Sequence, residues 1–111
     1  MVNSAVVNAV RNYLRSLQKH GMGVRFGVIF GSQVKGTADP GSDIDLLVVS
    51  PRFDSLRDRK DVDLLWRLAA QSDSRIEPIP CGERQWEEDD SSAIVEIARR
   101  EGEPVTLSEK S

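Results

Sequence analysis

Hydrophobic side chains recur at helical spacing near the start of the chain, and polar side chains separate them: Val6, Val10, Leu14 and Leu17 form the apolar stripe. Intervals of three and four residues predict an amphipathic helix whose apolar side faces a core. Asn3 or Ser4 has a side chain suited to the N-cap, and Gly21 is placed to end the helix.

Two shorter apolar runs, Val24–Phe30 and Asp43–Val49, predict strands. The segment between them, Gly31–Ser42, contains three glycines and one proline, which indicates a loop with room for one helical turn after Ser32. Beyond Asp45 the second run is apolar on both faces, as expected for a central strand that is covered on each side.

The second half of the chain predicts a helix, a strand, a second helix and a short final strand. The first helix spans Asp61–Gln71, and its apolar stripe consists of Val62, Leu65, Trp66 and Ala69. Two prolines in Arg75–Pro80 place the predicted strand at or near a sheet edge. The acidic run 87–92 is expected to be a solvated loop that ends in an N-cap. Ala93–Arg100 then forms the second helix, and Pro104–Leu107 the final strand.

This order of elements indicates a small α/β (α+β) fold, in which helices pack on a mixed sheet of three to four strands. A chain of 111 residues suffices for one compact domain, so we expect a single domain over residues 1–111. The content of 39% apolar and 30% charged residues is typical of a folded soluble protein. A net charge of -3 gives no overall attraction for nucleic acid, so nucleic acid is not expected as a direct ligand.

The composition also indicates a location in the cytoplasm. No apolar run approaches the roughly 20 residues that cross a bilayer, so no association with a membrane is expected. The first residues interrupt every apolar cluster with polar side chains, unlike a secretory signal. A single cysteine permits no internal disulfide, which fits a reducing compartment.

Four residues with chemically versatile side chains are expected to have structural roles. Cys81 has no histidine near it in sequence and is expected to pack in the core. His20 falls in the last turn of the first helix, where a capping or solvent-facing role is the default. Trp66 and Trp86 are expected to anchor the core or an interface, and an exposed Trp86 would mark a partner surface.

Two aspartates, Asp43 and Asp45, stand where the second strand begins. Residues two apart in a strand point to the same face, so the carboxylates lie side by side while Ile44 points into the core. Two such charges about 6–7 Å apart repel unless a cation or a proton neutralises them. Mg²⁺ takes one or two carboxylates and completes its octahedron with waters and substrate phosphate. The pair therefore predicts a Mg²⁺–nucleotide site better than a cage built from protein ligands alone.

The turn before these aspartates has features of a phosphate site. Gly31 lacks a side chain, so a phosphate can approach the backbone closely. Ser32 offers its N–H and its hydroxyl, and a helical turn beginning there adds the positive end of a dipole. Lys35 lies one turn further on, within reach of a phosphate oxygen. Ser42, just before the aspartates, is able to orient the start of the strand or to donate to a phosphate.

Three better-known motifs are excluded. GSQVKGTA is no Walker P-loop, because the order Lys-Gly-Thr is wrong and no helix-length apolar pattern follows. DPGSDID is no EF-hand loop, because apolar residues occupy positions that need oxygen ligands. Asp61 and Asp63 repeat the Asp-x-Asp spacing, but two residues apart in a helix diverge by about 200° and cannot share a metal.

Gly31-Ser32, ten further residues, and then Asp43-Ile44-Asp45 with an apolar run resemble the signature of the nucleotidyltransferase superfamily that includes DNA polymerase beta. The wording GSQVKGTADPGSDIDLLV looks like that of the minimal nucleotidyltransferase (MNT) domains. The later stretch IVEIARREGEPVTL is similar to the closing helix and strand of the family. The resemblance thus extends over most of the chain and implies a nucleotidyltransferase-like fold.

The resemblance also implies a third carboxylate on a later strand, inside an apolar-acid-apolar triplet. The matching position is Glu77, although Pro78 stands where an apolar residue is usual and Glu replaces the more common Asp. Two further departures lie in the loop, where Asp39 and Gly41 stand in place of a basic and an acidic residue. Asp39 lowers the positive charge available to a triphosphate.

By this resemblance, Asp43, Asp45 and Glu77 are the catalytic and metal-binding residues. They would hold two Mg²⁺ ions, with ATP as the substrate and Glu77 also serving as a general base. The implied reaction is in-line attack of a hydroxyl on the alpha-phosphorus, with release of pyrophosphate and no covalent enzyme intermediate.

The resemblance implies a protein partner as well. Larger relatives carry a helical domain that this chain has no residues left to form. Minimal nucleotidyltransferases look like the antitoxin half of a toxin–antitoxin pair, encoded beside a HEPN-domain protein whose tyrosine receives AMP. Two alternatives stay open: an inactive binding module that neutralises its partner by contact, and a small-molecule nucleotidyltransferase that acts as a homo-oligomer.

Overall fold

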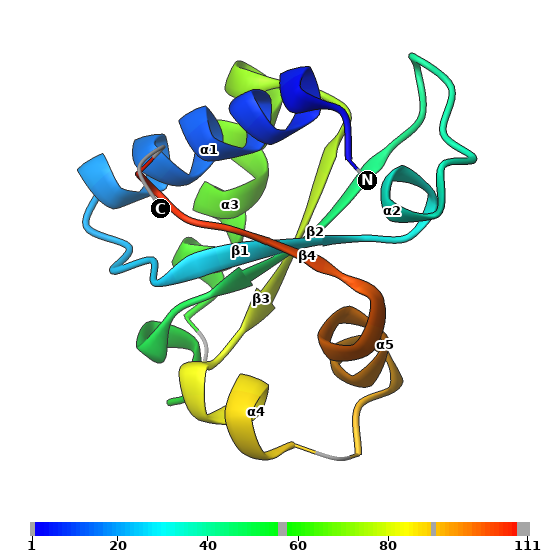
Figure 1. Cartoon of the computed structure of the whole chain (residues 1–111). Coiled ribbons are helices and arrows are strands. Elements are labelled where there is room, and N and C mark those ends of the chain that lie inside the picture. The colour runs from blue at the N-terminus through cyan, green and yellow to red at the C-terminus, as the bar shows by residue number, and fades with distance from the viewer. Residues whose placement is uncertain (1, 56–57, 90, 109–111) are drawn as a thin grey trace.

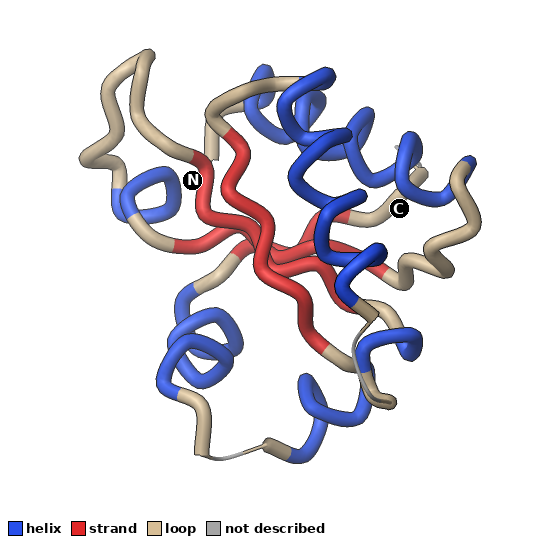
Figure 2. The backbone as a smooth tube through the Cα atoms, turned by 180° about the vertical axis from the view of Figure 1, so that it is seen from behind, coloured by secondary structure: helices blue, strands red, loops and turns tan. Residues whose placement is uncertain are grey.

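The protein folds into one four-stranded sheet with helices on both faces (Figures 1 and 2). The structure is a computed structural model, and it describes residues 2–55, 58–89 and 91–108. The elements in chain order are α1 (Ser4–Lys19), β1 (Phe26–Phe30), α2 (Ser32–Lys35), β2 (Ile44–Val49), the 3₁₀ helix η1 (Pro51–Phe53), α3 (Arg59–Ser72), β3 (Ile76–Cys81), α4 (Glu83–Glu88), α5 (Ala93–Glu101) and β4 (Glu103–Val105). The predicted α/β architecture is confirmed.

The strands lie in the order β3-β2-β1-β4. β1 is antiparallel to both β2 and β4, and β2 is parallel to β3. α1 and α3 cover one face of the sheet, and α4 and α5 lie on the other (Figure 1). In the described residues, none of the helices has the length and apolar character needed to cross a membrane.

The central strand β2 is buried on both faces, as its apolar sequence predicts. Ile44, Leu46 and Val48 belong to the core cluster that α1 and α3 cover. Leu47 and Val49 belong to the second cluster, together with Val95 and Ala98 of α5. Asp45 has the same parity as Leu47 and therefore lies on the α5 side of the sheet.

Helix α1 forms as its sequence predicts. The Asn3 side chain accepts a hydrogen bond from the Ala5 N–H at 2.7 Å and caps the first turn. At the other end, the Met22 N–H donates to the Leu17 carbonyl at 3.2 Å. This bond and a second one from Gly21 close the helix in a Schellman motif.

Several predicted boundaries are wrong by one or two residues. β1 begins at Phe26, and β2 begins at Ile44, one residue after Asp43. α3 begins at Arg59, two residues earlier than predicted, because the Asp58 side chain accepts the Lys60 N–H. The apolar stripe of α3 also differs, since Leu68 is buried and Trp66 is 48% exposed.

Helix α4 corrects the prediction of a loop over residues 87–92, because Glu87 and Glu88 end this helix. A residue far away in sequence caps its first turn: the Asp54 carboxylate accepts the Arg84 N–H at 3.0 Å and the Gln85 N–H at 3.3 Å. The usual capping signal precedes a helix directly in sequence, whereas this one comes from thirty residues away. Residue 90 of the run lies outside the described residues.

Strand β3 lies at a sheet edge, as its prolines predicted. The Ile44 N–H donates to the Arg75 carbonyl at 2.8 Å, and the Ser50 N–H donates to the Cys81 carbonyl at 3.0 Å. The odd-numbered residues therefore pair with β2, and Pro78 and Pro80 turn their ring nitrogens toward the open edge. These two positions lack an N–H that an incoming strand would need as a partner.

Candidate nucleotide and metal site

Three carboxylates meet at the end of the sheet where β2 and β3 begin. Asp43 directly precedes β2, and Asp45 is the second residue of that strand. Glu77 is the second residue of β3 and pairs in register with Asp45. The carboxyl groups of Asp43 and Glu77 are close enough to share a hydrogen bond. The structure thus brings together the three acidic residues that the sequence singled out.

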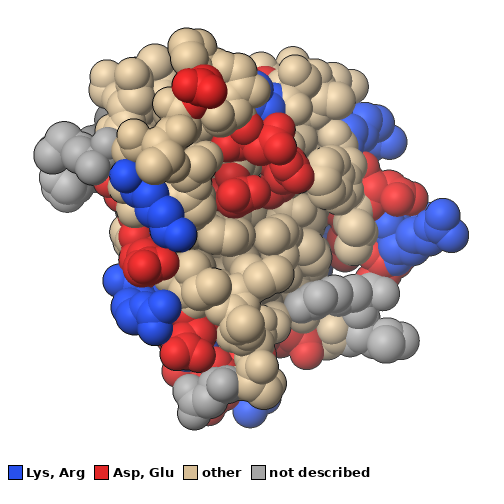
Figure 3. Space-filling view, turned by 90° about the vertical axis from the view of Figure 1, so that its right-hand side faces the viewer, with Lys and Arg blue, Asp and Glu red and all other residues tan. Residues whose placement is uncertain are grey.

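The electrostatics of this group favour a cation or a shared proton. The hydrogen bond with Asp43 raises the pKa of Glu77, and desolvation and the charges of Asp43 and Asp45 raise it further. Partial burial raises the pKa of Asp45, and the charge of Asp43 adds to this. Acidic side chains gather in a hollow on the side of the molecule that carries α2 (Figure 3). An ionised cluster of this kind repels itself until positive charge is supplied.

Gly31 joins β1 to α2 and lies directly against Asp45. Phe30 pairs with Asp45 across the two strands, which brings the next residue up to the carboxylate. Gly31 has φ 77° and ψ -144°, a conformation that side-chain-bearing residues rarely adopt. A Cβ atom at this position would overlap the Asp45 carboxylate oxygen. Glycine is therefore needed here both for the turn and for the space beside the carboxylate.

The other predicted phosphate-site residues surround this turn. Ser32 is the first residue of α2, so its N–H has no acceptor within the helix. Lys35 is the last residue of α2 and is exposed. The Ser42 hydroxyl accepts the Asp39 N–H at 2.8 Å, and the Ser42 N–H donates to the Asp39 carbonyl at 3.0 Å. These contacts tie Ser42 to the loop before β2, and phosphate binding by Ser32, Lys35 and Ser42 stays a prediction.

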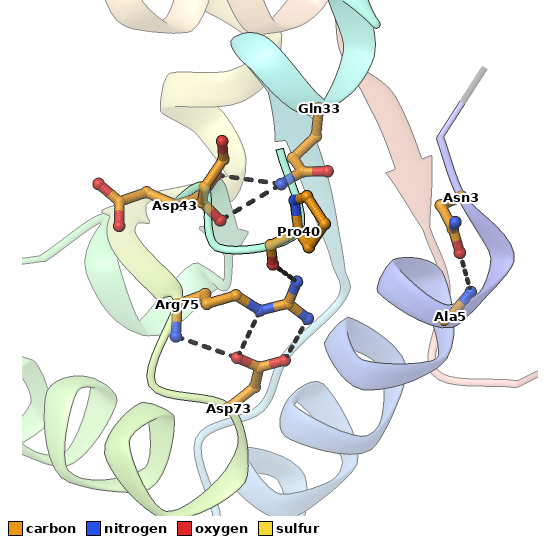
Figure 4. A network of polar contacts seen from close by, with 8 residues as sticks. Asn3, Ala5, Gln33, Pro40, Asp43, Asp73 and Arg75 are labelled. Atoms are coloured by element: carbon orange, nitrogen blue, oxygen red, sulfur yellow. Dashed lines mark hydrogen bonds and ion pairs between the residues drawn. The ribbon is translucent and has the colours of Figure 1, made fainter. Parts of the chain in front are cut away.

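Sequence reasoning missed two residues that hold the chain around Asp43. Gln33 of α2 is buried, with 8% of its surface exposed, and its amide donates to the Asp43 carbonyl at 3.3 Å. Arg75 donates to the Pro40 carbonyl at 2.9 Å (Figure 4). Neither residue has a local sequence signal, because each contacts a segment that approaches it only in the folded chain.

The carboxylates of the site fit a metal ion whose coordination shell is completed by the substrate. In the part of the chain that the structure describes, no group of three or more His, Cys, Asp or Glu side chains is arranged to hold a metal ion. Mg²⁺ requires only one or two carboxylates when waters and phosphate oxygens fill its other positions. Asp43 and Asp45 supply two such carboxylates, with Asp45 directly beside Gly31, and the side chain of Glu77 lies against that of Asp43.

Replacing Asp43 with asparagine is expected to stabilise the protein in metal-free buffer at pH 7. A carboxyl group whose folded pKa is raised stabilises the fold below its ordinary pKa and loses that contribution as pH rises through the folded pKa. Asp45 and Glu77 both behave in this way, from ordinary values of 3.8 and 4.5. Removing the Asp43 charge should raise the melting temperature by a few degrees, as expected for a partly exposed electrostatic contact.

Melting curves of wild type and Asp43→Asn between pH 7 and about pH 5 test this. The difference should shrink as the pH falls and the carboxyl groups of the wild type take up protons. The same substitution at Asp63, which is exposed on α3, serves as the control. A melting temperature that drops in Asp43→Asn at pH 7 would contradict the charge repulsion described above.

A glycine turn leads to a strand with two carboxylates, and a third carboxylate lies on the parallel neighbour, which is the arrangement that the sequence resemblance implied. A family model described as nucleotidyltransferase domain matches residues 7–99. The chain belongs to this family. No curated protein sequence matches it.

Solved structures share the fold at low sequence identity. A Sulfolobus solfataricus protein assigned to the nucleotidyltransferases superposes with a TM-score of 0.59 and 17% identity, over 73% of this chain and 70% of its own. A toxin–antitoxin structure with AMP-PNP superposes with a TM-score of 0.59 and 21% identity, over 89% of this chain and 74% of its own. Both share the overall fold of this chain.

Proposed function

We propose that the protein transfers the AMP group of ATP to a hydroxyl of a partner protein in a Mg²⁺-dependent reaction. The acceptor that we propose is a tyrosine of a HEPN-domain toxin encoded nearby, so that the protein acts as an antitoxin. One observation carries the proposal: Asp43, Asp45 and Glu77 lie close together, and Asp45 lies directly against Gly31. That arrangement offers metal ligands and a phosphate-binding turn at one place.

Each residue has a definite task in this reaction. Asp43 and Asp45 would hold the divalent cations, which would supply positive charge to the triphosphate and lower the pKa of the attacking hydroxyl. The backbone at Gly31 leaves room for a phosphate, and the Ser32 N–H is directed to donate to it. Glu77, whose pKa lies above the ordinary value, accepts the proton of the hydroxyl. The hydroxyl oxygen then bonds to the alpha-phosphorus, the bond to the bridging oxygen breaks, and pyrophosphate leaves.

Two further observations support the nucleotide and the partner. The toxin–antitoxin structure that shares the fold contains AMP-PNP, which favours an adenosine triphosphate as donor. Asp43 is exposed, and Asp45 and Glu77 are half-buried, so the three carboxylates are open to the surface. A hydroxyl on a protein surface can reach such a site, and the partner would cover the open side.

Incubation with alpha-labelled ATP, Mg²⁺ and the product of the adjacent gene tests the proposal. We expect label on the partner, removal of the label by phosphodiesterase treatment, and loss of labelling when tyrosines of the partner are replaced by phenylalanine. The matched reaction with gamma-labelled ATP should leave the partner unlabelled, because the gamma-phosphate departs with pyrophosphate.

Two outcomes would overturn the proposal in different ways. A partner that binds tightly and loses its toxicity without becoming labelled would establish neutralisation by contact alone. Labelling of a small hydroxyl compound, with no binding to the adjacent gene product, would establish a small-molecule nucleotidyltransferase. Gel filtration of the protein alone decides whether that activity belongs to a homo-oligomer.

A further inference from the structure

The segment between α2 and β2, residues 36–43, carries Asp43 at its end. Asp43 precedes the first residue of β2, so the strand ladder does not fix it as it fixes Asp45. The Asp43 carboxylate lies near Asp45 and Glu77 and raises the pKa of both. A movement of the segment would carry Asp43 away from these two groups.

Space for such a movement lies behind the segment. A cavity of about 320 Å³ opens between the segment and the start of α1, and Gln33, Asp39, Pro40 and Arg75 line it. The segment itself is largely exposed, since Lys35 to Thr37 and Asp39 to Gly41 all face solvent. Close packing therefore does not hold this part of the chain in place. Polar contacts from two buried or half-buried side chains do so instead.

Gln33 holds the segment at its end. Its side chain is buried, and the amide nitrogen lies 3.3 Å from the Asp43 carbonyl oxygen and 3.5 Å from the Ser42 carbonyl oxygen. The amide points from α2 to the main chain of Asp43 (Figure 4). Because α2 also begins at the phosphate-site turn, Gln33 ties Asp43 to the backbone beside Gly31.

Arg75 holds the segment from the opposite side. Its guanidinium forms two bonds to the Asp73 carboxylate, at 2.7 and 3.0 Å, and this bidentate contact fixes its orientation. The remaining nitrogen donates to the Pro40 carbonyl at 2.9 Å. The Arg75 carbonyl in turn accepts the Ile44 N–H at 2.8 Å. Arg75 thus contacts the chain on both sides of Asp43.

We propose that Gln33 and Arg75 are positioning residues that hold Asp43 in place and thereby set the affinity of the site for a divalent cation. The inference rests on the proposed function only in taking Asp43 as a metal ligand. Residues that orient metal ligands typically contribute 10–100-fold to metal affinity. The two contacts act on the same short segment, so their effects are coupled.

Binding of Mn²⁺ alone, followed by electron paramagnetic resonance on the full chain, tests the inference. Gln33→Met keeps the length of the side chain and removes its donor, and we expect about 10-fold weaker Mn²⁺ binding. Arg75→Met should weaken binding to a similar extent, and Arg75→Lys should restore part of the loss. Gln71→Met makes the same chemical change at an exposed position of α3 and should bind Mn²⁺ like wild type.

Melting temperatures separate positioning from a merely structural role. Should Gln33→Met fail to fold, Arg75→Lys carries the test, because it retains the charge and loses the two-point contact with Asp73. Folded variants that bind Mn²⁺ as tightly as wild type would overturn the inference, as would an Asp43→Asn variant with unchanged Mn²⁺ affinity. Because no acceptor or nucleotide enters this experiment, a protein that binds Mn²⁺ as expected but transfers no AMP refutes the proposed function and leaves the positioning role supported.

Discussion

Replacing Asp43 and Asp45 together with asparagine is expected to lower AMP transfer by at least about 10³-fold. The two carboxylates are the ligands that we assign to the metal, and metal ions contribute several kcal/mol of charge stabilisation in the transition state. Asparagine keeps the size and shape of both side chains while removing their charge. The loss should therefore come from chemistry rather than from unfolding, and the rate of label transfer under single-turnover conditions measures it.

A matched control for this double variant exists within the chain. Asp61 and Asp63 have the same Asp-x-Asp spacing, but they lie on α3, where Asp61 pairs with Arg52 at 2.8 Å and Asp63 is exposed. Changing these two residues to asparagine should leave transfer within a few-fold of wild type. Transfer that persists in the Asp43 and Asp45 variant would refute the assignment of the site.

Gly31→Ala is expected to lower both the stability and the activity. The backbone conformation at this position is strained for any residue with a Cβ, at a cost of about 1–3 kcal/mol in the free energy of unfolding. The new methyl group would also occupy the space of the Asp45 carboxylate oxygen. Since that side chain is the flexible partner, it should turn away, and transfer should fall by about 10²-fold from misplacement alone.

Gly21→Ala separates the two effects of this substitution. Gly21 has φ 79°, close to the value at Gly31, but a Cβ atom there would meet nothing within 4 Å. Gly21→Ala should therefore be destabilised while transfer stays close to wild type at a temperature where both variants are folded. Equal activities of the two alanine variants would show that the approach of Gly31 to Asp45 has no catalytic importance.

The sequence predicted most of the fold because most of its elements carry local signals. The stripe of α1, the apolar runs of β1 and β2, and the paired prolines of β3 each indicate their own structure within a few residues. Helix α4 was missed because its N-cap, Gly82, has no side chain, and Asp54, which accepts N–H groups of the first turn, comes from another part of the chain. Trp66 was wrongly placed on the buried stripe of α3, because tertiary contacts rather than local sequence decide which side of this helix is buried.

The residues of the candidate site also fall into those that local sequence predicts and those that it does not. Asp43 and Asp45 are two residues apart, and strand geometry alone predicts that their carboxylates lie side by side, whereas Glu77 was indicated only by the family resemblance. Gln33 and Arg75 could not be predicted, because their partners are main-chain carbonyl groups, which every residue has. Contacts of this kind carry no pattern in the sequence and emerge only when the chain is folded.

Pro78, a departure from the expected triplet at the sequence level, serves the site in the structure. It is buried and pairs with Leu46 of β2, so it takes the place of the apolar residue that was expected. A residue before proline is restricted to extended conformations, which fixes the backbone of Glu77 in the strand. The proline therefore removes a freedom from the third carboxylate that an ordinary apolar residue would leave.

Pro78 and Pro80 together also affect how other protein chains can pair with the sheet. Pro78 and Pro80 offer no N–H at the open edge of β3, so pairing of a further strand, from another copy of the chain or from a partner, is disfavoured there. The other edge of the sheet is short, and the chain leaving it is held by Arg11 and Arg15 of α1. A partner that docks beside β3 would then be recognised through its side chains, which differ from protein to protein, rather than by backbone pairing.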